Sequence, residues 1–65
     1  MENDMHYHLL IQHQRKGTLI EGPIENKWYA INCAREECSW PDTVGVQVLD
    51  DRDRVVHTET GIAHS

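Results

Sequence analysis

The chain has 65 residues, with eleven Asp and Glu against six Lys and Arg for a net charge of −5, and only 38% of it is hydrophobic. This length predicts a single domain over residues 1–65, with a small core and little room for an enclosed catalytic pocket. The acidic balance argues against direct binding to nucleic acid or to a membrane surface, because both need a basic face.

The chain also lacks the signals of export or membrane insertion. No apolar stretch approaches the roughly 18 residues that a spanning helix needs. Residues Met1–Asp4 are acidic, whereas a secretory signal would begin with basic residues. The two cysteines, Cys33 and Cys38, are too few for a disulfide scaffold. We therefore expect a reduced, cytoplasmic setting.

The first third of the chain predicts a β-hairpin. Apolar and polar residues alternate in Tyr7–His13, which predicts a strand whose odd-numbered residues face the core. Arg15–Gly17 predicts a turn, because glycine tolerates a positive φ. Thr18–Glu21 predicts a short returning strand that ends at the pair Gly22-Pro23.

A helix is predicted next, with Asn26 as its N-cap and its end near Cys38. Its end is set by the break at Ser39–Asp42, where Pro41 bars the preceding residue from the helical region. Trp28 is the largest side chain of the stripe expected to face the core, which consists of Ile24, Trp28, Ile31, Ala34 or Arg35, and Cys38.

The last third predicts a second hairpin. Val44–Leu49 alternates and predicts a strand, Asp50–Asp53 predicts a turn, and Val55–Glu59 predicts the partner strand. The residues from about 61 to 65 are predicted to form a flexible tail.

These elements predict an α+β fold, a small antiparallel sheet of three to four strands with one helix packed on one face. The order is β-β-α-β-β, or β-α-β-β if the second strand does not pair. The other face of the sheet would meet water or another subunit.

The predicted connectivity also places acidic residues together. The first strand and the helix would both begin at the end of the molecule where the third strand finishes. The carboxylates expected there would share the site with Lys27, Arg52 and Arg54. The candidate binding residues are Asp50, Asp51, Asp53 and Glu25, with Glu21, Asp4 and Glu2 as weaker members.

The acidic turn Asp50–Asp53 has three interpretations. Aspartate commonly bonds to the backbone of its own turn, so the residues can serve the hairpin alone. The spacing does not match a calcium loop, and Arg52 interrupts the acids. The third interpretation is a surface that presents carboxylates to a basic partner, because an arginine guanidinium binds carboxylate and phosphate with the same fork geometry.

Other chemistry is not favoured. His6 and His8 could share a metal, but the C-x₄-C spacing of the cysteines on a helix does not match the usual zinc knuckle. A Cys/His nucleophile pair has no local signature, and the glycines do not form a phosphate loop. The sequence therefore predicts no metal, no cofactor and no enzyme activity.

In size, charge and element order, the whole chain resembles the small acidic phage-type anti-CRISPR proteins. It is most similar in kind to the DNA-mimicking inhibitors of type I CRISPR complexes, among them those of type I-C. That class shares no signature sequence, so the resemblance transfers no individual residue role.

The resemblance implies a non-enzymatic inhibitor in the host bacterial cytoplasm. Its acidic surface would occupy the basic DNA-binding surface of a CRISPR surveillance complex in place of DNA phosphates and block target binding. It would contact neither nucleic acid nor membrane, and a monomer is favoured over a dimer. The alternatives are a homo-oligomeric structural or regulatory module, pairing through a free sheet face or strand edge, and a metal-binding regulator.

Overall fold

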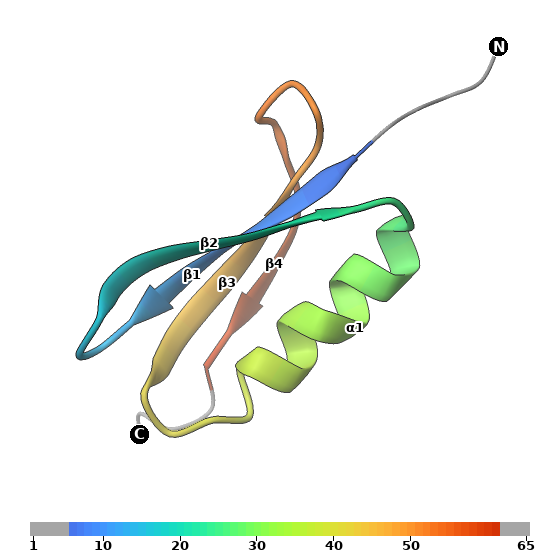
Figure 1. Ribbon diagram of the computed structural model, residues 1–65. Coiled ribbons are helices and arrows are strands. Elements are labelled where there is room, and N and C mark those ends of the chain that lie inside the picture. The colour runs from blue at the N-terminus through green and yellow to red at the C-terminus, as the bar shows by residue number, and fades with distance from the viewer. Residues whose placement is uncertain (1–5, 62–65) are drawn as a thin grey trace, which may run out of the picture.

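The computed structural model describes residues 6–61, which form a four-stranded antiparallel sheet with one helix on one face (Figure 1). The strand order is β2-β1-β3-β4, and the order along the chain is the predicted β-β-α-β-β. The elements are β1 Tyr7–His13, β2 Gly17–Ile24, α1 Lys27–Glu37, β3 Thr43–Leu49 and β4 Val55–Thr60.

The first hairpin is confirmed, but its second strand is longer than predicted. Gly17 adopts a φ of +79° as the turn ends. β2 continues past Glu21 to Ile24, because Gly22 and Pro23 form a bulge opposite β1 instead of ending the strand. β2 is an edge strand, so its outer side pairs with no other strand. The missing N–H of Pro23 therefore removes no hydrogen bond between strands on that side.

The helix begins as predicted at Asn26, whose side-chain oxygen accepts hydrogen bonds from the N–H groups of Trp28 and Tyr29 at 2.9 and 3.1 Å. It ends at Glu37, with Cys38 as the C-cap.

The prediction that Trp28 belongs to the core is wrong, since this residue is 70% exposed. Ile31, Ala34 and Cys38 of the predicted stripe are buried, and Ala30 is buried in place of Trp28. The two alanines let the helix lie close to the sheet. Ile24, the predicted start of the stripe, is the last residue of β2 and only packs against the edge of the core.

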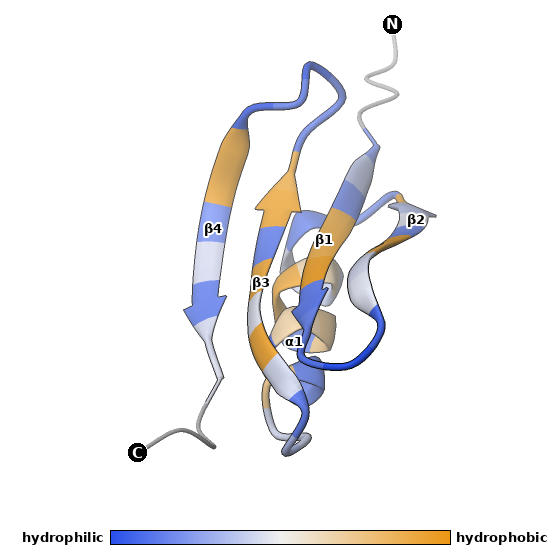
Figure 2. Ribbon diagram, turned by 90° about the vertical axis from the view of Figure 1, so that its left-hand side faces the viewer, coloured by the Kyte–Doolittle hydropathy of each residue, from blue (hydrophilic) through white to orange (hydrophobic). Residues whose placement is uncertain are grey.

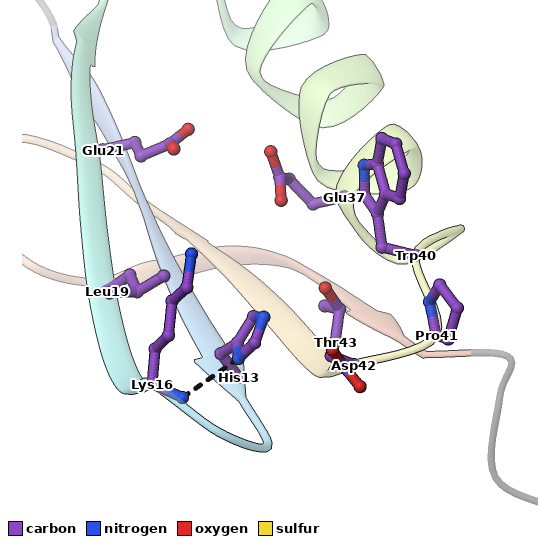
Figure 3. Close-up of a pocket in the computed structure, with 9 residues that line it drawn as sticks. All are labelled: His13, Lys16, Leu19, Glu21, Glu37, Trp40, Pro41, Asp42 and Thr43. Carbon is purple, nitrogen blue, oxygen red and sulfur yellow. Dashed lines mark hydrogen bonds between the residues drawn. The ribbon is translucent and has the colours of Figure 1, made fainter.

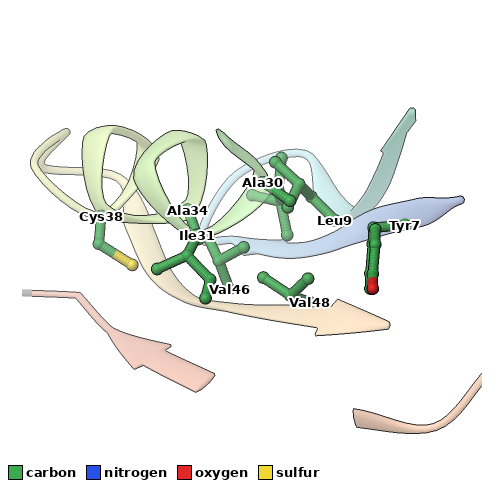
Figure 4. Close-up of a cluster of buried hydrophobic side chains, with 9 residues drawn as sticks. Tyr7, Leu9, Ala30, Ile31, Ala34, Cys38, Val46 and Val48 are labelled. Atoms are coloured by element: carbon green, nitrogen blue, oxygen red, sulfur yellow. The ribbon is translucent and has the colours of Figure 1, made fainter. Parts of the chain in front are cut away.

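The core lies between α1 and the central strands β1 and β3 (Figure 4). The odd-numbered residues of β1 face it, as predicted. A bulge in β3 opposite Gln12 and His13 shifts the alternation of buried and exposed side chains by one residue. Thr43 is therefore buried and Val44 is exposed. The buried apolar residues are Tyr7, Leu9, Ile11, Ala30, Ile31, Ala34, Cys38, Val46 and Val48.

Figure 2 views the sheet from the side opposite the helix. We call this side, which α1 does not cover, the open face. Within residues 6–61 no helix is long and apolar enough to cross a membrane. The predicted tail lies outside the described residues except for Gly61, which is buried and donates its N–H to the Val44 carbonyl at 2.8 Å.

Candidate functional site

The structure brings Glu25 and the turn Asp50–Asp53 to the same end of the molecule, which we call the acidic end (Figure 1). The connection from β2 to α1 and the connection from β3 to β4 both lie here, beside the start of β1. A pocket of about 340 Å³ opens at this end, lined by His6, His8, Pro23, Asp50, Asp51 and Asp53.

Asp50 holds the turn together from inside. Its side chain is only 3% exposed. One carboxylate oxygen accepts hydrogen bonds from the N–H groups of Arg52 and Arg54 at 2.8 and 2.9 Å, and the other accepts from Nε of Arg54 at 3.1 Å. The Arg54 N–H above all, with the Arg52 N–H and the Arg54 guanidinium, holds the pKa of Asp50 below its usual range. The structure thus shows both oxygens of the Asp50 carboxylate bonded within the turn.

This arrangement predicts how acid affects stability. Because the folded protein lowers the pKa of Asp50, the unfolded chain takes up the proton at a higher pH, and stability falls as pH drops through the folded-state pKa. The variant Asp50→Asn should have a lower urea midpoint at pH 7 and a shallower loss of stability in acid than the wild type.

The matched control is Asp51→Asn, since Asp51 is exposed in the same turn. Its urea midpoint should follow that of the wild type at every pH. Equal acid sensitivity of the wild type and Asp50→Asn would show that the Asp50 hydrogen bonds do not stabilise the fold.

Three carboxylates at the acidic end are free. Glu25, Asp51 and Asp53 are exposed, and their side chains make no hydrogen bond or ion pair with any residue in the range 6–61. Asp53 has a φ of +63°, which aspartate tolerates in turns. Arg54 pairs with Asp50 and with none of these three carboxylates.

Glu21 lies away from this end. It lines a second pocket, of about 300 Å³, where α1 finishes. Figure 3 shows Glu21 on β2 and Glu37 on α1 pointing toward each other across this pocket, with Trp40 on its wall. Burial raises the pKa of Glu37, and the charges of Glu21 and Glu36 add to the effect.

Apart from Glu59, which pairs with Arg35 and His57, the carboxylates of residues 6–61 are therefore divided between the two ends of the fold. The end opposite the acidic end carries Glu21, Glu36, Glu37 and Asp42 beside Arg15 and Lys16. The other two predicted site residues, Glu2 and Asp4, lie outside the described residues. Of the predicted set, the acidic end gathers Glu25 with the three aspartates of the turn.

Two exposed aromatic residues near the acidic end were not predicted as its companions. Trp28 and Tyr29 are 70% and 62% exposed in the first turn of α1, directly after Glu25 and Asn26. The ammonium nitrogen of Lys27 lies 5.8 Å from the centroid of the Trp28 ring.

Both cysteines are free thiols. Cys38 is 3% exposed, and burial raises the pKa of its thiol, with Glu59 adding to the effect. Cys33 packs against the edge of the core. No group of three or more His, Cys, Asp or Glu in this range is arranged to hold a metal ion.

A charged cluster that the sequence did not indicate joins β4 to the helix. Nε2 of His57 lies 2.6 Å from a carboxylate oxygen of Glu59, and Nε of Arg35 lies 3.2 Å from the same oxygen. The hydrogen bond from His57, with that from Arg35, lowers the pKa of Glu59. Of these contacts, the one between Arg35 and Glu59 links the edge strand β4 to α1.

Comparison with models of known protein families, with curated proteins and with solved structures finds no match to this chain. Its function must therefore be inferred from the site itself.

Proposed function

We propose that this protein acts by binding, and that its acidic end docks on a basic, nucleic-acid-binding surface of another protein. Glu25, Asp51 and Asp53 would take the place of nucleic-acid phosphates there. The resemblance to small anti-CRISPR proteins makes the DNA-binding surface of a type I CRISPR complex the specific target, and inhibition of target DNA binding the outcome.

The observation that carries this proposal is that these three exposed carboxylates have no partner within the described residues. A carboxylate already bonded inside the protein, such as Asp50, would have to give up those bonds before it could meet an arginine. Free carboxylates on short connections can meet the guanidinium groups of a partner without such a loss.

The aromatic residues of the first helical turn give this interface its apolar contacts. Trp28 and Tyr29 sit beside Glu25 and expose more than half of their surface. Tryptophan and tyrosine often dominate binding energy where they are buried in an interface. In this proposal the charges speed and orient the encounter, and the two rings slow dissociation.

Binding to a purified type I complex tests the proposal. The triple variant Glu25→Gln, Asp51→Asn, Asp53→Asn should lose at least about tenfold in affinity, or ~1.4 kcal/mol, because it removes the proposed contacts. Wild-type affinity should also fall steeply as salt rises, as it does when phosphates bind the same groups.

The control is Glu21→Gln, Glu36→Gln, Asp42→Asn, which removes the same charge from the opposite end. It should bind within about twofold of the wild type, since long-range charge alone mainly alters the association rate. Equal losses in both triple variants would mean that net charge, and not the acidic end, determines binding. Failure of the wild type to bind would reject the CRISPR target.

A further inference from the structure

The pocket where α1 finishes combines carboxylates with an aromatic wall (Figure 3). Glu21 on β2 and Glu37 at the end of α1 face it from two sides. Asp42 and the exposed ring of Trp40 reach it from the connection between α1 and β3. The three carboxylates make no side-chain hydrogen bond or ion pair with any residue in the range 6–61. The pocket therefore offers several unpaired acceptors.

A buried hydroxyl also opens into this pocket. The bulge in β3 turns Thr43 toward the helix side of the sheet, where the residue is only 2% exposed. Its hydroxyl makes no hydrogen bond with another part of the described chain, and Figure 3 shows it directed toward the pocket. A buried polar group without a partner costs free energy. The position of this hydroxyl therefore points to a polar ligand in the pocket.

The charges around the pocket favour a cationic ligand over an anionic one. Nδ1 of His13 accepts hydrogen bonds from the N–H groups of Arg15 and Lys16, both at 3.1 Å, so this nitrogen carries no proton and the ring is neutral. Among the lining residues, which all belong to the described range, one cationic side chain, Lys16, opposes three carboxylates. Burial raises the pKa of Glu37, and the neighbouring carboxylates add to the effect. A bound cation would offset that repulsion.

We propose that this pocket binds a guanidinium group on an alkyl chain, the chemistry that an arginine side chain shares with small alkylguanidines. A guanidinium is planar and has donors on several edges, so it can bond to Glu21 and Glu37 at once and still donate to the Thr43 hydroxyl. Its flat face can stack on the indole of Trp40. An ammonium carries the same charge without the planar face or the fork of donors. The pocket volume of about 300 Å³ suits a small group of this kind.

A titration of the full chain with N-butylguanidinium chloride, followed by NMR at constant ionic strength, tests the proposal. The Trp40 indole and Thr43 amide signals should shift and saturate, with a dissociation constant that is roughly millimolar for so small a ligand. The Trp28 indole, at the other end of α1, is the internal control and should not follow the same curve. Butylammonium should bind at least about threefold more weakly, and neutral butylurea should not bind.

Matched variants locate the site. Glu37→Gln should weaken N-butylguanidinium binding at least about fivefold, because it removes a charged acceptor from the pocket. Glu36→Gln removes the neighbouring exposed carboxylate, which does not line the pocket, and should leave the dissociation constant within about twofold. Thr43→Val keeps the shape of the side chain without its hydroxyl and should weaken binding about threefold. The NMR spectrum of each variant checks that the fold is retained.

Three results would overturn the proposal. The first is a Trp40 or Thr43 signal that does not saturate by about 50 mM ligand. The second is butylurea binding as tightly as N-butylguanidinium, and the third is an equal loss of affinity in Glu37→Gln and Glu36→Gln.

A blocked tripeptide with a central arginine distinguishes the two sources of the guanidinium. Binding at least about fivefold tighter than N-butylguanidinium would identify an arginine of another protein as the ligand, because the backbone then contributes contacts. Binding that is no tighter would identify a small alkylguanidine.

This inference does not rest on the proposed function, because the pocket and the acidic end lie at opposite ends of the fold. Asp51→Asn and Asp53→Asn should weaken partner binding and leave the dissociation constant of N-butylguanidinium within about twofold. Glu37→Gln should have the reverse effects, so each proposal can fail alone.

Discussion

Replacing Leu9 with alanine should destabilise the protein by about 3 kcal/mol, a large part of its total stability. Leu9 is 0% exposed and packs at the centre of the core between β1 and α1. The substitution leaves a cavity that the remaining buried core residues can fill only partly. Urea unfolding followed by circular dichroism measures the change.

The neighbouring Leu10 is the matched control, because it is the same residue type on the opposite face of the same strand. In dilute solution, Leu10→Ala should cost less than about 1 kcal/mol, since this side chain is only partly buried. Equal losses from both substitutions in dilute solution would contradict the assignment of β1 residues to the two faces.

The second large effect is expected at Gly22, where alanine should cost at least about 3 kcal/mol. Its φ of +132° disfavours any other residue. A Cβ at this position would also lie 2.8 Å from the carbonyl oxygen of Tyr7 and 2.9 Å from the ring of His8. The ring could move, but the carbonyl belongs to the backbone of the adjacent strand. Thermal and urea unfolding would both show the loss.

Gly17 separates the two causes. Its φ is also positive, at +79°, but a Cβ there would meet no atom within 4 Å. Gly17→Ala should therefore lose only about 1 kcal/mol, the cost of the backbone conformation alone. If Gly17→Ala were as damaging as Gly22→Ala, the close approach of β1 and β2 at Gly22 would not explain the effect.

Much of the fold follows from local signals in the sequence. The alternation of Tyr7–His13 gave the correct core face of β1, because a strand has a period of two. Asn26 marked the start of the helix, since its side chain can accept the first free N–H groups. Gly17 marked the first turn because glycine tolerates a positive φ.

Features that depend on packing could not be predicted in this way. The spacing allows a helical stripe that includes Trp28 and one that includes Ala30, and only contact with the sheet decides between them. The bulge that buries Thr43 and exposes Val44 likewise depends on the pairing of β3 with β1.

The sequence predicted which connections between helices and strands lie together at the candidate site. The order of the elements along the chain was enough to place Glu25 and the turn Asp50–Asp53 at one end. The sequence could not show that Asp50 is bonded inside the turn, because its partners depend on the turn geometry. Nor could it place Glu21, since the distance of that residue from the acidic end depends on how far β2 continues.

The central claim, that the acidic end takes the place of nucleic-acid phosphates, is tested most directly by competition on a purified type I complex. Labelled protein would be bound to the complex and titrated with its target duplex, and then with a non-specific duplex. We predict that the target duplex displaces the protein fully, and that the protein's apparent dissociation constant rises in proportion to the free duplex. A complex that holds the protein and its target duplex together would contradict the claim.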